Sequence, residues 1–162
     1  MSRERQGRGQ QTAPRRRRVR TGRERDRGAP VLVVEMDPLV ASLIGSQLEL
    51  ARVGSVIASG AAEGLEAVEQ GRQLRAAIIE LRLPERDGWW LVARIRELAA
   101  GTPIVVITGL ADPHVVERAA GARCALLVKP FSAGDLLQKL ADAARLMERL
   151  GTRVVPGLLL GA

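Results

Sequence analysis

Several residue types are scarce in this sequence of 162 residues, and each scarcity excludes a class of protein. The single cysteine, Cys124, excludes an internal disulfide and fits a reducing compartment. No apolar run approaches the roughly 20 residues that a membrane-spanning helix requires, and the N-terminus lacks the apolar core of a secretory signal. These absences predict a cytoplasmic protein that has no membrane partner.

Aromatic residues and histidine are also rare. Trp89, Trp90 and Phe131 are the only aromatic residues, and His114 is the only histidine. One tryptophan is expected to pack inward from a helix, and the other to be half-buried or exposed, where it would be an interface candidate. We expect His114 on the surface of a short helix, without a function, and Cys124 as a small buried apolar residue.

Charge of one sign is concentrated at the N-terminus. Residues 1–30 contain eleven arginines and three acidic residues, a balance of +8, so the rest of the chain has a balance of −1 within the total of +7. A segment rich in Arg, Gly and Gln cannot bury enough apolar surface to offset its ordering entropy. We therefore predict a disordered tail over residues 1–29, a folded domain over 30–150 and a short C-terminal tail over 151–162.

The arginine-rich tail has three interpretations. The first is contact of residues 3–27 with a nucleic acid or an acidic partner through charge neutralisation. Because this tail has no aromatic residue to stack on bases, such nucleic-acid binding would be non-specific and sensitive to salt. The second is a solvated tail with no dedicated partner, and the third is an upstream stretch translated from a wrongly chosen start.

Residues 30–150 alternate between short β-branched runs and longer stretches of helical period. The runs predict strands at 31–35, 53–57, 76–80, 103–108 and 124–129. The periodic stretches predict a helix that starts at Pro38 and includes Leu50, and further helices at 61–70, 89–99, near 113–120 and at about 133–149. This alternation is typical of an α/β fold with a parallel sheet covered on both faces.

Local signals mark the starts of two helices. Asp37 before Pro38 predicts an N-cap followed by proline at the first helical position, and Ser132 with Asp135 predicts a capping box. The apolar residues of the first helix are expected to pack on the sheet. They are Leu39, Leu43, Ile44, Leu48 and Leu50.

Polar residues collect where the predicted strands end. Glu35, Met36 and Asp37 follow the first strand, Glu80 ends the third, Thr108 ends the fourth, and Lys129 ends the fifth. The carboxyl ends of parallel strands meet at one edge of the sheet, and carboxylates, a hydroxyl and an ammonium together favour binding of an oxyanion or a metal. Since these residues include no nucleophile–base pair and no metal-ligand cluster, we do not expect an independent enzyme.

The chain from about residue 31 to 149 resembles the receiver domain (CheY-like) of bacterial two-component response regulators. The resemblance lies in VLVVEMDP at the first strand, IIELRLPERDGWW at the third, PIVVITG at the fourth and LLVKPF at the fifth. It implies a flavodoxin-like, doubly wound sheet of five strands between two helical layers. It also implies that an aspartate after the third strand accepts a phosphoryl group from a sensor kinase, that an acidic pair helps to bind Mg²⁺, and that Thr or Ser and Lys contact the phosphoryl oxygens.

The sequence departs from this family at its acidic positions. Glu80 takes the phosphoacceptor position, where the family has Asp, and Met36 takes the second position of the acidic pocket of Glu35, Met36 and Asp37. A thioether is a poor ligand for the hard Mg²⁺ ion. We therefore expect no bound metal beyond a weak residual Mg²⁺ site at Glu35 and Glu80. Met36 is expected to fill the space of the metal.

These departures predict that phosphorylation is inefficient or lost. The extra methylene of Glu80 displaces its carboxylate by about 1.5 Å, whereas phosphoryl transfer needs sub-ångström positioning. The carboxylate is expected either to reach Thr108 and Lys129, which match the residues that contact the phosphoryl group in the family, or simply to pair with Lys129. Leu126 takes the family's aromatic switch position, which predicts that the family's usual response to the phosphoryl group is altered.

The resemblance favours a stand-alone signalling module that acts by protein–protein contact, a pseudo-receiver. Its partner would be a sensor histidine kinase or a downstream effector, contacted through the last two helices and the fifth strand, and a homodimer is left open. The alternatives are a working phosphoacceptor response regulator and a nucleic-acid-associated protein whose folded part carries the basic tail.

Overall fold

The computed structural model describes residues 28–155. The tail predicted over residues 1–29 lies almost wholly outside the described residues, as do residues 156–162 of the predicted C-terminal tail. Both therefore stay predictions. Within the described part of the chain, no helix is both long enough and apolar enough to cross a membrane.

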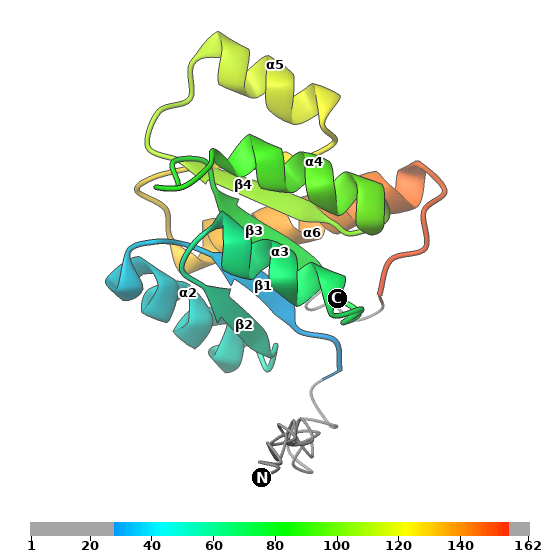
Figure 1. The fold of residues 1–162 in the computed structure, drawn as a ribbon, viewed down its shortest axis with the longest axis horizontal. Helices are drawn as coiled ribbons and strands as arrows, with labels where there is room; N and C mark the ends of the chain where they lie inside the picture. The colour runs from blue at the N-terminus through cyan, green and yellow to red at the C-terminus, as the bar shows by residue number, and fades with distance from the viewer. Residues whose placement is uncertain (1–27, 156–162) are drawn as a thin grey trace, which may run out of the picture.

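Five parallel strands form one sheet in the order β2–β1–β3–β4–β5, with helices on both sides (Figure 1). The strands are β1 Val31–Val34, β2 Ser55–Ala58, β3 Ala76–Glu80, β4 Ile104–Thr108 and β5 Ala125–Val128. The helices are α2 Pro38–Leu50, α3 Ala61–Glu69, α4 Gly88–Leu98, α5 Pro113–Gly121 and α6 Ala133–Arg149. This confirms the predicted doubly wound α/β fold, and the second strand begins two residues later than its sequence pattern indicated.

The sheet separates two hydrophobic cores. Successive side chains of a strand point to opposite faces, so Leu32 and Ile79 enter one core while Val33 and Ile78 enter the other. The first core is closed by α3 and α4, with Ala119 from α5, and the second by α2 and α6. Because both faces are covered, the central strands read as continuous apolar runs, which made them recognisable in the sequence.

The packing predicted for α2 is partly wrong. Ile44 and Leu48 are fully buried, as expected, but Leu39, Leu43 and Leu50 are 80%, 53% and 79% exposed. A helix has 3.6 residues per turn, so positions 44 and 48 face the sheet while 39, 43 and 50 lie on the opposite side. The apolar composition of α2 was therefore mistaken for a single buried face.

Other local predictions are confirmed. The Asp37 side chain accepts the backbone N–H groups of Leu39 and Val40, which caps α2, and the Ser132–Asp135 capping box is complete.

The rare residue types, Trp, Cys and His, also have the burial that the sequence predicts. Trp89 is buried and Trp90 half-buried, Cys124 is buried, and His114 is exposed on α5. Burial raises the pKa of the Cys124 thiol to about 11, which is consistent with an unreactive core residue.

Two helices end in a left-handed residue that is not glycine. Arg52 follows α2 with a φ of 59°, and Arg123 follows α5 with a φ of 58°. After α5, the Arg123 N–H donates to the Ala120 carbonyl at 3.0 Å and the Cys124 N–H to the Ala119 carbonyl at 2.9 Å. This is the Schellman pattern, in which glycine normally takes the left-handed position.

Arg123→Gly is therefore expected to raise the free energy of unfolding by about 0.5 kcal/mol. The left-handed conformation costs an L residue roughly 1–2 kcal/mol, and the greater unfolded-state entropy of glycine offsets about 0.5–1 kcal/mol of that gain. Urea unfolding measures the difference. Glu117→Gly, at an exposed site inside α5, is the control and should lower stability by about 1 kcal/mol. A loss of stability in Arg123→Gly would contradict the argument.

Candidate functional site

The carboxyl ends of the central strands lie level with one another. The parallel register pairs Val34 with Ile79, Glu80 with Ile107, and Thr108 with Val128. Glu35, one residue beyond β1, is thus beside Glu80 on the adjacent strand β3. The fold brings together four residues that the sequence placed at strand ends: Glu35, Glu80, Thr108 and Lys129.

Lys129 forms the centre of this site. Its Nζ lies 2.8 Å from Oε2 of Glu35 and 2.6 Å from Oε2 of Glu80. Glu35 and Glu80 are only 3% and 5% exposed, whereas the Lys129 side chain is 29% exposed. One ammonium group therefore bridges two buried carboxylates, and the peptide bond from Lys129 to Pro130 is cis.

Backbone groups bind the remaining carboxylate oxygens. Oε1 of Glu35 accepts the Asp37 N–H at 3.0 Å, and Oε1 of Glu80 accepts the Arg82 N–H at 2.9 Å. All four oxygens of the two carboxylates thus have a partner. These donors could not be anticipated from the sequence, because main-chain N–H groups occur at nearly every residue and their direction depends on the loop conformation.

The surroundings of Lys129 act on its pKa in opposite directions. Burial lowers the pKa of the ammonium group, but hydrogen bonds and the negative charges of Glu35 and Glu80 outweigh burial, so the pKa is raised above its ordinary value. The Lys129 side chain is therefore a charged ammonium group at neutral pH.

Thr108 lies at this edge but its hydroxyl is bound elsewhere. The hydroxyl donates to the Leu110 carbonyl at 2.9 Å and accepts the Leu110 N–H at 3.1 Å. Within residues 28–155, the hydrogen bonds and ion pairs of the Glu80 carboxylate go to Lys129 and Arg82. Of the two expected partners of Glu80, the structure thus supplies Lys129, and Thr108 instead stabilises the turn after β4.

Comparison with known proteins identifies the family and the fold of this chain. The sequence pattern of the response regulator receiver domain matches residues 31–141. This chain belongs to that family. Receiver domains are signalling modules, and the five-stranded parallel sheet with helices on both sides is the fold that this chain shares with them.

Named relatives of this receiver domain are regulators. It is 34% identical over 143 residues to the transcriptional regulatory protein PdtaR of Mycobacterium tuberculosis, a match that covers 76% of this chain and 67% of PdtaR. It is 30% identical over 116 residues to the transcriptional regulatory protein GlrR of Escherichia coli K12, covering 71% of this chain. The chain spans about a quarter of the length of GlrR, since the match covers 26% of that protein.

Solved structures share the fold of this receiver domain. A CheY-like receiver domain protein from Methanospirillum hungatei matches with a TM-score of 0.68 and 25% identity, covering 76% of this chain and 98% of that one. A sensor protein from Polaromonas sp. JS666 matches with a TM-score of 0.66 and 28% identity, covering 74% and 98%.

The acidic pocket of this receiver domain does not fit Mg²⁺. Mg²⁺ requires several hard oxygen ligands in near-octahedral geometry. The oxygens of Glu35 and Glu80 are bound to Lys129 and to main-chain N–H groups, and Asp37 caps α2. Met36 offers only a soft thioether. Across residues 28–155 there is no group of three or more His, Cys, Asp or Glu side chains that could hold a metal ion.

Met36 does not fill a metal-sized space, contrary to the expectation from sequence. Its side chain is 51% exposed, whereas a side chain that filled the pocket would be buried. Lys129 lies between the carboxylates instead. The Lys129 ammonium group, from the loop after β5, is the better occupant, because it offsets negative charge that a methionine would leave without a partner.

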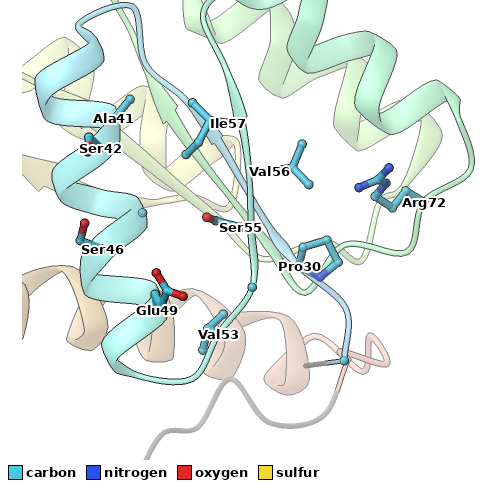
Figure 2. A pocket seen from close by; sticks show the side chains of 13 residues that line it. Pro30, Ala41, Ser42, Ser46, Glu49, Val53, Ser55, Val56, Ile57 and Arg72 are labelled. Atoms are coloured by element: carbon cyan, nitrogen blue, oxygen red, sulfur yellow. The ribbon is translucent and has the colours of Figure 1, made fainter. Parts of the chain in front are cut away.

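Leu126, on β5, and a surface groove have separate surroundings. Leu126 is half-buried and packs against the core beneath α3 and α4. The groove, of about 650 Å³, lies between α2 and the edge strand β2 (Figure 2). It is lined by residues such as Ser42, Ser46, Ser55 and Ile57, and it contains none of the strand-end residues.

Proposed function

We propose that this receiver domain signals by protein–protein contact with conventional aspartate phosphorylation lost. The observation that carries the proposal is the bridge from Lys129 to both Glu35 and Glu80 at 2.8 and 2.6 Å. It occupies the carboxylates with a cation that belongs to the protein itself. A site stabilised in this way has a fixed conformation that does not depend on a phosphoryl group.

The geometry of Glu80 also argues against a nucleophile. Phosphoryl transfer needs a carboxylate oxygen that can align with the incoming phosphorus, and a metal ion to neutralise developing charge. Oε2 of Glu80 is held by Lys129 and Oε1 by the Arg82 N–H, and the residue is 5% exposed. With Met36 in the second acidic position, the metal ligand that would draw a phosphodonor into place is missing.

The proposed partner is a sensor histidine kinase or a downstream effector. Support comes from apolar side chains that stay exposed around α5 and β5, namely Leu110, Val116 and Val128. Arg118 on α5 lies over the Trp89 ring of α4, 4.9 Å from its centroid, so α5 is tied to α4 by a cation–π contact. We infer that this surface presents one fixed shape to the partner.

Restoring the family residues tests the proposal. The receiver domain and its Met36→Asp/Glu80→Asp variant are each incubated with acetyl phosphate and Mg²⁺. Intact-mass spectrometry is expected to show no phosphoryl adduct on the parent protein and an acid-stable but base-labile adduct on the double variant. The single variants Met36→Asp and Glu80→Asp test the metal ligand and the nucleophile one at a time. Each is expected to carry much less phosphoryl adduct than the double variant.

Beryllofluoride with Mg²⁺ provides a second readout, because it mimics the phosphoryl group without a covalent reaction. Tryptophan fluorescence should change in the double variant and stay constant in the parent protein, while circular dichroism verifies that both are folded. A phosphoryl adduct on Glu80 of the parent protein would refute the proposal and favour a working phosphoacceptor.

A further inference from the structure

Helix α5 is held to the rest of the fold by very little apolar packing. Ala119 is its one buried residue, whereas each of the other four helices within residues 28–155 has three or more. Figure 1 shows α5 at the outside of the fold, at the top of the view. Apolar burial is what normally fixes a helix in a domain, and a single alanine contributes little of it. Other contacts must therefore set the position of α5.

Arg96, near the end of α4, supplies the first of these contacts. Its guanidinium donates to four main-chain carbonyls. They belong to Ala122 (from Nε, 3.1 Å), Arg123 (from Nη2, 2.8 Å), Thr102 (from Nη1, 2.6 Å) and Ala100 (from Nη1, 3.3 Å). Ala122 caps the C-terminus of α5, and Ala100 lies just beyond the end of α4. One side chain thus joins the ends of two helices and the segment before β4.

The chemistry of this contact requires an arginine. The C-terminus of a helix carries unpaired carbonyls and a partial negative charge, so α4 and α5 both direct acceptors at the cation. The planar guanidinium has five donors in fixed directions and can bind carbonyls on two sides at once, which the compact ammonium of lysine cannot do. Arg96 is half-buried, so water competes less for these charge-assisted hydrogen bonds.

A second contact joins the same two helices. The Arg118 guanidinium of α5 lies over the Trp89 ring, 4.9 Å from its centroid. Trp89 and Arg96 are seven residues apart in α4, which places them on the same side of that helix and about 10 Å from each other along its axis. The two arginines therefore hold α5 at two points on one side of α4.

We propose that Arg96 is a latch that fixes the position of α5, and that α5 opens from the domain as a unit when this latch is released. The Arg118–Trp89 contact is the weaker of the two, because Arg118 is exposed and a cation–π contact at an exposed site contributes little. Once the hydrogen bonds of Arg96 are lost, the burial of Ala119 alone is too small to hold the helix.

The latch and the acidic site lie at opposite edges of the sheet. Arg96 binds the segments that precede β4 and β5, at the amino ends of these strands, whereas Lys129 follows the carboxyl end of β5. The position of α5, which carries the exposed Val116, is therefore set away from the Lys129 bridge. That this position shapes a partner surface rests on the proposed function, but the latch itself does not.

Cys124 provides a direct probe of the opening. It is the only cysteine of the chain, it is buried, and its N–H donates to the Ala119 carbonyl of α5 at 2.9 Å. Burial lowers the pKa of the Arg96 guanidinium and the neighbouring Cys124 side chain partly offsets this effect, so the thiol lies beside the latch. A thiol reagent reaches Cys124 only when α5 opens or the whole domain unfolds.

The rate at which the folded full chain reacts with Ellman's reagent tests the latch. Arg96→Met removes the donors but keeps a long side chain, and it is expected to raise the labelling rate at least about tenfold, because hydrogen bonds to a charged group are strong enough for that factor. Arg94→Met is the matched control. Arg94 is also half-buried on α4, but it pairs with Glu97 of the same helix, so this variant should react like the parent protein.

Urea distinguishes the opening of α5 from unfolding of the whole domain. Opening one helix exposes little surface, so the labelling rate should depend only weakly on urea below the unfolding transition, in the parent protein and in Arg96→Met. Amide hydrogen exchange should agree, with the α5 amides less protected than those of α2 and α6. Circular dichroism verifies that each variant is folded under the labelling conditions.

Three outcomes overturn the latch. One is a labelling rate in Arg96→Met equal to that of the parent protein. Another is a labelling rate that follows urea as steeply as global unfolding does, which would show that α5 does not open by itself. The third is a parent-like rate in Arg96→Lys, which keeps the charge without the planar donors. No phosphodonor or metal enters these measurements, so their result is independent of the proposal for Glu80.

Discussion

Replacing Lys129 by methionine is expected to lower the free energy of unfolding by about 3 kcal/mol at neutral pH. Removing one partner of a buried ionic cluster leaves uncompensated charge, at a typical cost of roughly 3–5 kcal/mol. The lower end applies because the Lys129 side chain is 29% exposed and part of its effect is screened by water. For a domain of this size, the melting temperature should fall by roughly 10 °C.

A second substitution makes this result specific to the bridge. Glu80→Gln removes one of the two buried negative charges while its amide oxygen can still accept the Arg82 N–H. In the Lys129→Met background, Glu80→Gln should therefore recover about half of the lost stability, whereas in the parent protein it should destabilise. Losses that simply add in a double-mutant cycle would show that Lys129 and Glu80 are not energetically coupled.

The pH dependence of stability provides a further measurement on the same variant. Because the folded-state pKa of Lys129 is raised, its contribution is fully present below the ordinary lysine pKa of about 10.4. It is lost as pH rises through the raised folded-state value. The stability difference between the parent protein and Lys129→Met should thus be constant near neutral pH and shrink in the alkaline range.

Gly88→Ala is the second change with a large expected effect. A Cβ atom at Gly88, the first residue of α4, would lie 2.4 Å from the Glu80 carbonyl oxygen and 2.9 Å from the Leu81 Cα. These are backbone atoms, so no side-chain rotation relieves the clash. We expect a stability loss of about 3 kcal/mol, at the upper end of the usual cost of overpacking.

The same substitution should disturb the acidic site. The α4 start can move only if the end of β3 moves with it, and that would shift Glu80 relative to Lys129. The stability difference between the parent protein and Gly88→Ala should then shrink in the alkaline range, as it does for Lys129→Met. Gly121→Ala is the control, because an added Cβ there meets nothing within 4 Å, and it should be neutral or slightly stabilising. Equal effects of the two alanine substitutions would contradict the packing argument.

Much of the fold could be predicted because its causes are local. The buried strands show as β-branched runs, and Asp37, Pro38 and Ser132 mark helix starts through short-range capping. Strand ends of a parallel sheet meet at one edge whatever the details of the loops, so the amino-acid sequence was sufficient to group Glu35 and Lys129 with Glu80.

The sequence predictions that failed concerned the direction in which a side chain or a main-chain group points. The exposure of Leu39, Leu43 and Leu50 followed from which side of α2 meets the sheet, and composition alone does not reveal that. The exposed position of Met36 and the turn made by Thr108 likewise depend on loop conformation. So do the main-chain N–H groups that bind the Glu35 and Glu80 carboxylates.

The sequence by itself determined the chemical groups at the site, since Glu80, Met36 and Lys129 are fixed once their strands are recognised. Only the tertiary structure decided how those groups are used. Lys129 is 94 residues from Glu35 in the chain, and whether its ammonium contacts one carboxylate, both or neither depends on strand order and loop geometry. The exposure of Leu39, Leu43 and Leu50 on α2 was decided in the same way, because burial is a property of the packed fold.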